Sequence, residues 1–267
     1  TVRLRMDVRD WGRPDANSGS AAYDGALQQA PLLDKQGFRV ILQVNSEGGQ
    51  MPSYARAKAL FDWLLRRPGA KSVDVVEVLG PVTERAANAD AFSTTLTREQ
   101  QAQRYVDGPL KAADEVVHAA RKKVLGGAFT PWQQAGDLTA AGAWGLGVTK
   151  AYVAAGYLDR VDYAGFHPDQ PTAKAQRVWV DRARAVLGDT PIWVSEWQLT
   201  RQSFDSDGTY LDAMGDAAAQ LHSRVGVACY AGFTPEDGAV PVTEGGLGGY
   251  READPAFDAY RDWPKSG

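Results

Sequence analysis

The chain has 267 residues, of which 44% are hydrophobic and 23% charged; this is the composition of an ordinary folded protein and excludes a disordered one. Its net charge of −4 argues against a surface for nucleic acid or anionic membranes, because such a surface needs a basic patch. No apolar run approaches the roughly 20 residues that span a bilayer. The single cysteine, Cys229, excludes an intramolecular disulfide and a cysteine-based zinc site.

Short β-branched runs alternate with longer helical stretches along the chain, a pattern typical of a parallel sheet covered by helices. Three glycines, Gly37, Gly156 and Gly188, stand just past predicted helices, where helix C-terminal caps belong. In chain order, we predict strands at 2–8, 38–44, 73–79, 123–129, 161–167, 191–197 and 226–233. The predicted helices lie near 23–36, 54–66, 98–122, 146–156, 172–187 and 209–223.

These strand–helix units, without a dinucleotide-binding loop, predict an α/β fold of the (β/α)8 TIM barrel type, formed as a single domain over residues 1–267. The stretch GLGVTK at 145–150 lacks the spacing of a phosphate loop and does not follow a strand, so we do not expect it to bind a nucleotide. The strand count is one short of eight, and we expect either that the first strand was lost upstream of Thr1 or that the barrel closes atypically. Because no starting methionine or signal-like segment is present, a trimmed or mature product is expected.

Alternation within the strands sends polar side chains toward the barrel interior. The first strand keeps its apolar residues on one face, which leaves Arg3 to point inward. The same pattern places Asn45, Glu77 and His167 in the interior. An unpaired buried charge costs several kcal/mol, so these charges are expected to pair. Such networks are kept where ligand recognition or chemistry uses them, and structural ion pairs are the competing explanation.

The run PIWVSEW at 191–197 ends a predicted buried strand on a carboxylate, Glu196, which stands between two tryptophans. Glu196 shares its face of the strand with Ile192 and Val194, and we expect this face to line the barrel axis.

Six segments follow one another along the chain: TVRLRMDVRDW (1–11), YDGALQQAPLLDKQGFRVILQV (23–44), KVLGGAF (123–129), AAGYLDRVDYAGFHPD (154–169), PIWVSEW (191–197) and DPAFDAYRDW (254–263). In this order they resemble the retaining glycoside hydrolases of the (β/α)8 superfamily called clan A, with families 39 and 5 nearest. The resemblance covers nearly the whole chain. It implies that Glu196 is the nucleophile, that Arg3 is the arginine supporting it, and that His167 is an active-site histidine. A polysaccharide or oligosaccharide is the implied substrate.

Retaining hydrolysis needs a second carboxyl group about 5–5.5 Å from the first, to protonate the leaving oxygen. The family's fourth strand ends in a tryptophan-asparagine-glutamate-proline run preceded by another glutamate. Here the stretch is VEVLGPVTE, and alignment on Glu77 places Gly80 at the asparagine and Pro81 at the acid.

Three explanations stay open for the missing acid. In the first, Glu84 folds back over the end of the strand and supplies the proton; the competing interpretation of Glu84 is a solvated loop acid. In the second, Glu77 supplies the proton through an unusual register, although its Cα lies about 13 Å deeper by strand rise. In the third, hydrolysis has been lost. Acids at other strand ends are weaker candidates: Asp7, Asp10, Glu47 and Asp169.

Aromatic residues in strand-end loops are predicted to stack on sugar rings, and these are Trp11, Trp132 and Trp197. Asn45 and Tyr230 complete the predicted sugar-binding set. No spacing of histidine, aspartate or glutamate resembles a metal site, so we predict neither a metal nor a cofactor. A serine hydrolase is disfavoured because the chain has no G-x-S-x-G motif.

The leading hypothesis is therefore a glycosidase that acts on a polysaccharide, as a monomer, with a secreted or periplasmic location in a bacterium and no role on nucleic acid. The alternative is a catalytically impaired carbohydrate-binding or polysaccharide-assembly protein on the same fold. A barrel enzyme of other chemistry is a third possibility, and it predicts a bound metal or phosphate at the strand ends.

Overall fold

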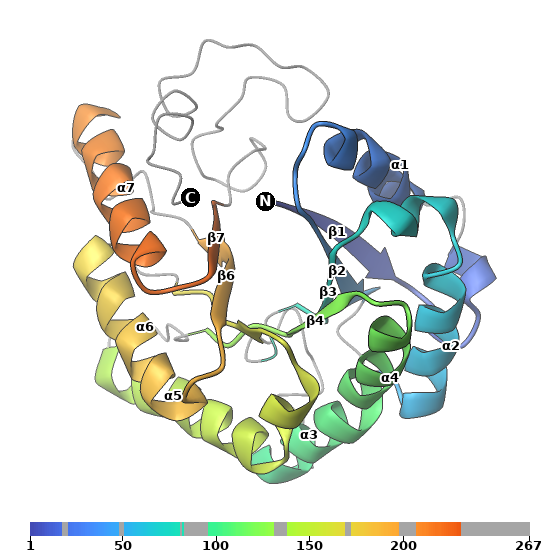
Figure 1. Ribbon diagram of the computed structural model, residues 1–267. Helices are drawn as coiled ribbons and strands as arrows, with labels where there is room; N and C mark the ends of the chain where they lie inside the picture. The colour runs from blue at the N-terminus through green and yellow to red at the C-terminus, as the bar shows by residue number, and fades with distance from the viewer. Residues whose placement is uncertain are drawn as a thin grey trace.

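A computed structural model describes residues 1–17, 21–47, 51–80, 82, 96–130, 138–168, 172–197 and 207–230. In this part of the chain the strands lie inside an arc of helices that runs from α1 round to α7 (Figure 1). The strands are β1 (Val2–Val8), β2 (Val40–Ser46), β3 (Val75–Val78), β4 (Lys123–Gly126), β5 (Ala164–Gly165), β6 (Ile192–Trp197) and β7 (Val227–Tyr230). The α-helices are α1 (Ala21–Lys35), α2 (Tyr54–Leu64), α3 (Arg98–Tyr105), α4 (Lys111–Ala119), α5 (Leu138–Ala154), α6 (Ala173–Leu187) and α7 (Asp207–His222).

All strand ladders are parallel and follow chain order. One sheet runs β1-β2-β3-β4 and the other β5-β6-β7. Two isolated parallel bridges, Leu125 to Tyr163 and Phe129 to Phe166, connect the sheets between β4 and β5. Within the described residues no ladder joins β7 to β1, so these strands form an open arc (Figure 1). Consecutive parallel strands wrapped by helices confirm the predicted barrel class.

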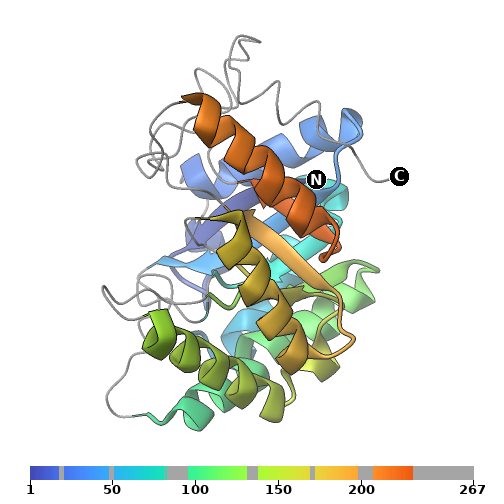
Figure 2. The ribbon, with the colours of Figure 1, turned by 90° about the vertical axis from the view of Figure 1, so that its left-hand side faces the viewer.

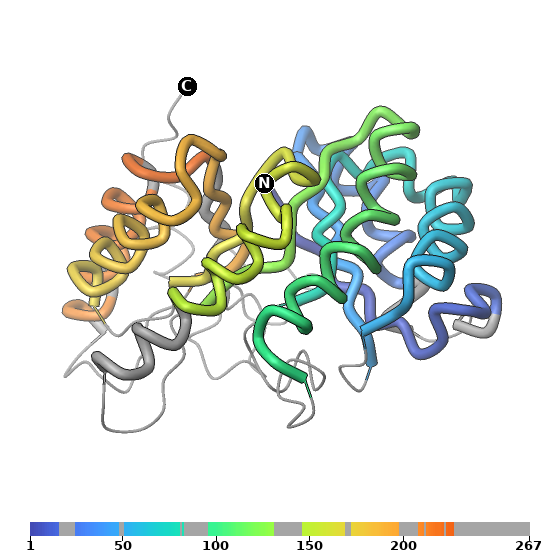
Figure 3. The backbone as a smooth tube through the Cα atoms, turned by 90° about the horizontal axis from the view of Figure 1, so that it is seen from below, coloured from blue at the N-terminus to red at the C-terminus, as the bar shows by residue number. Residues whose placement is uncertain are grey.

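The helices cover the outer face of the arc on both flanks. Helices α2 and α4 lie side by side on one flank, and α6 and α7 on the other (Figure 3). Helices α5, α6 and α7 follow one another over the second sheet (Figure 2). Among the helices described, none is long and apolar enough to cross a membrane.

Local chemistry explains where several helices begin and end. Thr97 and Gln100 form a capping box at the start of α3, and Thr172 caps α6. The three glycines predicted as caps, Gly37, Gly156 and Gly188, all adopt positive φ, which favours glycine.

One predicted helix is divided in the structure. The stretch predicted at 98–122 forms α3, a π-helical turn (Val106–Leu110) and α4. Gly108 has non-helical angles (φ −96°, ψ −107°), and the next residue, Pro109, cannot donate a backbone hydrogen bond. The GLGVTK stretch, by contrast, lies inside α5, where no loop for a phosphate exists.

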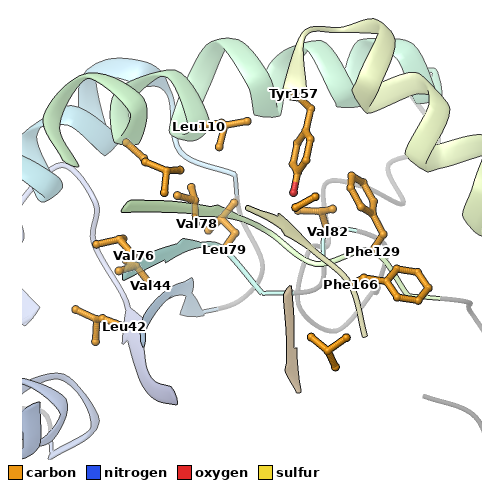
Figure 4. Close-up of a cluster of buried hydrophobic side chains, with 14 of the residues drawn as sticks. Leu42, Val44, Val76, Val78, Leu79, Val82, Leu110, Phe129, Tyr157 and Phe166 are labelled. Atoms are coloured by element: carbon orange, nitrogen blue, oxygen red, sulfur yellow. The ribbon is translucent and has the colours of Figure 1, made fainter. Parts of the chain in front are cut away.

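Two apolar layers lie on opposite sides of the strands. The larger one fills the space between strands and helices, and Figure 4 shows part of it, including Val44, Val78 and Leu110. The smaller one lies on the inner face, where Tyr163 stacks on Trp193 with ring centroids 3.9 Å apart. It consists of Ile41, Val75, Leu125 and Trp193, with Tyr163 packed against it. The polar residues of the inner face follow directly along the same strands.

Glycine permits the close approach of β4 and β5. A Cβ atom on Gly165 would lie 2.4 Å from the carbonyl oxygen of Gly126 and 2.9 Å from the Cα of Ala128. These are backbone atoms of the neighbouring strand region, so they cannot move aside without shifting the strand. Gly25, in α1, offers a contrast, because a Cβ atom added there would have no other atom within 4 Å.

We predict that Gly165→Ala lowers the free energy of unfolding by about 1–3 kcal/mol, because the added methyl group overpacks the junction of the two sheets. The matched variant Gly25→Ala should raise it by about 0.5–1 kcal/mol, since alanine is the better helix former and has room. Urea denaturation of both variants measures the two changes. A Gly165→Ala variant as stable as the unsubstituted protein would show that β4 and β5 do not approach this closely.

Candidate active site

A single arginine contacts two carboxylates inside the barrel. Arg3, on β1, donates from Nε to Oε2 of Glu77 on β3 at 2.9 Å, and from Nη1 to Oε2 of Glu196 on β6. The three side chains come from strands that are far apart in the sequence. The two carboxylates therefore lie against one guanidinium group, and neither charge is left without a cation.

An irregularity in β6 brings Glu196 to this position. Ile192 and Val194 face the helices and belong to the outer core. Strict alternation would send Glu196 to that same side. However, the pairing of β6 with β7 shifts register between Val194 and Trp197, and bulges of this kind redirect side chains near active sites. The inward position of Glu196 was predicted from alternation, and that reasoning was wrong: the register shift, and not the parity, points the carboxylate at Arg3.

Behind Glu77 lies a buried chain of hydrogen bonds. The Ser195 hydroxyl donates to Oε1 of Glu77 at 3.1 Å, and Nε2 of His167 lies 2.8 Å from the same hydroxyl. The exposed fractions are 0% for Glu77, 2% for Ser195 and 1% for His167. Glu196, by contrast, has a side chain that is 36% exposed. Of the two carboxylates on Arg3, only Glu196 can therefore meet a ligand from solvent.

The charge state of Glu196 follows from its neighbours. Burial favours the neutral acid, but the pKa of Glu196 is nevertheless lowered, because the hydrogen bond from Arg3 and the positive charges of Arg3 and Arg5 favour the carboxylate. His167 would add to this effect only as an imidazolium. Burial lowers the pKa of His167 to about 3, so its ring is neutral at ordinary pH. Arg3 is therefore the cation that holds Glu196 ionised.

Glu77 differs from Glu196 in the direction of its shift. Burial raises the pKa of Glu77, and the charge of Arg3 and the Ser195 hydrogen bond only partly oppose this effect. The negative charge of Glu196 raises the pKa of Glu77 further. Two carboxylates on one arginine thus have opposite tendencies, one toward the charged form and the other toward the neutral form.

The end of β3 departs from a regular strand just where the expected acid motif is absent. Leu79 has φ 65°, a left-handed conformation that is rare for a branched residue. A Cβ atom on Gly80 would lie 2.6 Å from Oδ1 of Asn45 and 3.1 Å from Nε2 of Gln43. The side-chain amide of Asn45 therefore occupies the space that a side chain at position 80 would need. Within the described part of the chain, Asn45 Oδ1 and Gln43 Nε2 are buried and have no hydrogen-bond partner.

Several predicted site residues fall elsewhere. Glu84 and Trp132, together with Pro81 and Asp169, lie outside the described residues. Tyr230 is the last residue of β7, and only its backbone is described. Trp197 is 1% exposed and packs in the outer core, so it presents no face for a sugar ring.

The other predicted aromatic and acidic residues are engaged locally. Trp11 is 5% exposed and packs edge-on against Phe61. Asp7 accepts hydrogen bonds from Arg5, and Glu47 pairs with Arg9. Asp10 accepts from the backbone of the following turn, at Gly12 and Arg13. Among the described residues, no three histidine, cysteine, aspartate or glutamate side chains come together as metal ligands.

Sequence reasoning did not single out Ser195. The alternation that predicted an inward Glu196 would send Ser195 to the opposite face; in the structure Ser195 shares the inner face of β6 with Trp193.

No family model matches the chain, and no curated protein matches its sequence. Among solved structures, a GH26 β-mannanase from Bacteroides ovatus has a TM-score of 0.54 at 11% identity, over 90% of this chain and 74% of that one. A hyperthermophilic β-glucosidase mutant has a TM-score of 0.52 at 8% identity, over 78% of this chain and 64% of that one. The AHE enzyme from Alicyclobacillus herbarius has a TM-score of 0.52 at 13% identity, over 85% and 72%.

These likenesses concern the fold, because the identities are low. The chain shares its barrel architecture with glycoside hydrolases. The predicted nearness to families 39 and 5 stays a prediction.

We predict that Arg3→Gln lowers the free energy of unfolding by about 3–5 kcal/mol, because it leaves two adjacent carboxylates without a cation. Adding Glu77→Gln to that variant should recover part of the loss, since it removes the buried charge. Arg5→Gln is the matched control: its side chain is 66% exposed, and its loss should change the free energy by less than about 0.5 kcal/mol. Urea denaturation compares the four proteins, and equal effects of Arg3→Gln and Arg5→Gln would contradict the shared ion pair.

Proposed function

We propose that this protein is a glycoside hydrolase that cleaves a polysaccharide or oligosaccharide by a retaining mechanism, with Glu196 as the nucleophile. The observation that carries the proposal is the state of Glu196. It stands at the carboxyl end of β6, is partly exposed, and is held ionised by Arg3. The carboxyl ends of barrel strands are where active sites of this fold lie.

The chemistry requires these properties. In the first step a carboxylate oxygen of Glu196 attacks the anomeric carbon, and the bond to the leaving oxygen breaks while an acid protonates that oxygen. In the second step the same acid, now a base, takes a proton from water, and the water oxygen displaces Glu196. Because attack needs the charged form, the lowered pKa of Glu196 supports its role as nucleophile.

Glu77 does not meet the requirements of the acid. Although its pKa is raised, as a general acid needs, its side chain is 0% exposed and lies behind Arg3 and Ser195. A sugar oxygen cannot reach it there. We therefore assign the acid role to Glu84, as part of the same proposal, and assign Glu77 to holding Arg3.

The comparisons support this proposal through the fold. The structures that share the barrel architecture include a β-mannanase and a β-glucosidase. A secreted or periplasmic location and a monomeric state belong to the proposal as well, since polymeric carbohydrate is met outside the cytoplasm.

A second candidate function is carbohydrate binding without hydrolysis. It is favoured by one observation: within the described residues, the carboxyl group paired with Glu196 through Arg3 is Glu77, which is too deeply buried to protonate a leaving group. Such a protein would keep the barrel and the exposed carboxylate of Glu196 and lack turnover.

We predict that the protein releases reducing ends from at least one polysaccharide in a panel, and that Glu196→Gln reduces this release by about 10³-fold or more. Glutamine keeps the shape of the side chain but cannot attack, so folding should be unaffected by circular dichroism. Asp181→Asn, at an exposed site on α6, serves as the control and should retain full activity. Turnover retained in Glu196→Gln would remove Glu196 from the mechanism.

We predict that Glu84→Gln slows cleavage of poor leaving groups by about 10²–10⁴-fold, because these need protonation, and slows cleavage of activated aryl glycosides far less. Glu47→Gln, which removes an exposed acid at another strand end, is the control. An unchanged rate on poor leaving groups would return Glu84 to a solvated loop acid. Slower migration of the protein in gels that contain a polysaccharide, with no reducing ends released by the wild type or any variant, would favour the binding function.

A further inference from the structure

The hydrogen bonds behind Glu77 do more than hold its carboxylate in place, because they connect it to a histidine through a serine. The three residues, His167, Ser195 and Glu77, form a continuous line of hydrogen bonds, with 2.8 Å between Nε2 and Oγ and 3.1 Å between Oγ and Oε1. The Nε2 atom of His167 lies 4.0 Å from Oε1 of Glu77, so the hydroxyl stands between them. All three are at least nine-tenths buried, and bulk water does not interrupt the line.

A hydroxyl in the middle of such a line has one proton, so it can donate a hydrogen bond to only one of its two neighbours at a time. When Glu77 is ionised, Ser195 donates to it, and the serine oxygen then accepts from His167, whose proton must be on Nε2. When Glu77 is protonated, it donates to Ser195, and Ser195 donates to Nε2. The histidine is neutral in both states, but its proton is on Nε2 in the first and on Nδ1 in the second.

The two states differ by one proton, and the line can transfer it. A proton taken up at Nδ1 of His167 releases the Nε2 proton to the serine oxygen, and the original hydroxyl proton of Ser195 passes to Glu77. No other atom changes its bonds. The neutral ring required by both states agrees with the burial of His167, which lowers its pKa to about 3.

The charge of Glu77 affects the ionisable groups that surround it. Arg3 faces it from β1, and Glu196 shares that arginine from β6. The charge of Glu77 also raises the pKa of two phenols, those of Tyr105 on α3 and Tyr157 on the 3-10 helix Tyr157–Arg160. Burial is the larger cause of both shifts, and both phenols stay neutral. Arg3 is therefore the cation that responds to the charge of Glu77.

We propose that Ser195 is a positioning residue that couples the protonation of Glu77 to the tautomer of His167. Through the protonation state of Glu77, it sets how strongly the positive charge of Arg3 acts on each of the two carboxylates, Glu77 and Glu196. An ionised Glu77 takes part of that charge, whereas a protonated Glu77 leaves it to Glu196. The role rests on the proposed function only in treating Glu196 as the reacting group.

The test is NMR spectroscopy of the protein labelled with ¹⁵N-histidine, since long-range ¹H–¹⁵N correlations distinguish the two neutral tautomers from the imidazolium. The chain has three histidines, so assignment by single substitution is simple. Between about pH 8 and about pH 4, His167 should change from the Nε2–H to the Nδ1–H tautomer without becoming charged. His118 is the internal control, because it pairs with Asp114 and Asp162 and should become an imidazolium.

Three variants separate coupling from simple packing. Ser195→Ala should abolish the tautomer change, and Ser195→Thr, which keeps the hydroxyl, should restore it. Glu77→Gln cannot ionise and should hold His167 in one tautomer at every pH, which provides a second route if Ser195→Ala does not fold. The signals of His118 and His222 report whether each variant is folded.

Two results would overturn the proposal. One is a wild-type His167 that shows no tautomer change or that becomes an imidazolium in this range. The other is a change that persists at the same pH in Ser195→Ala. Because no substrate is needed, these outcomes are distinguishable from the failure of the glycosidase proposal, which depends on released reducing ends.

If turnover is found, its pH profile gives a second readout. Ser195→Ala removes a hydrogen bond that favours ionised Glu77, so Arg3 should act more fully on Glu196. The acidic limb of kcat/KM should then shift to lower pH in Ser195→Ala and return in Ser195→Thr, and an unshifted limb would contradict the division of charge.

Discussion

One guanidinium group serving two carboxylates is the constraint on which the rest of the site depends. A carboxylate inside a barrel is costly unless a cation accompanies it. Arg3 accompanies both Glu77 and Glu196, although one is fully buried and the other reaches solvent. The arrangement gives the exposed carboxylate a stable charge, while the buried one fixes the arginine in place. The charge of Glu196 thus depends on an arginine that is held by a residue closed off from solvent.

The barrel supplies this arrangement through local departures from regular structure. The register shift in β6 turns Glu196 inward, and the left-handed Leu79 ends β3 so that Gly80 lies against Asn45. Glycine at position 165 lets β4 and β5 approach closely. The first two of these departures place polar groups on the inner face, namely Glu196 beside Arg3 and the Asn45 amide beside Gly80. The regular parts of the strands, by contrast, build the apolar layers that carry the site.

The succession of strand-like and helical stretches was enough to predict the barrel class, and alternation within the first strand predicted the inward position of Arg3. Glu196 was also identified, but for a wrong reason, because alternation cannot reveal a register shift that depends on pairing with a neighbouring strand. Trp197 was expected in a strand-end loop, where it could stack on a sugar ring, but it is the last residue of β6 and packs in the outer core. Ser195 was missed because a serine carries no distinctive signal until the residues on either side of it in space are known.

Titration of the Glu196 carboxyl group measures whether Arg3 holds this side chain ionised. Protein labelled with ¹³C at the glutamate carboxyl carbons gives one resonance for each side chain, and the resonance absent from Glu196→Gln identifies Glu196. We expect this carboxyl to titrate below the range of an ordinary glutamate and its pKa to rise when Arg3 is replaced by glutamine. A Glu196 that titrates at or above the ordinary range, unaffected by the loss of Arg3, would contradict the control of its charge by Arg3.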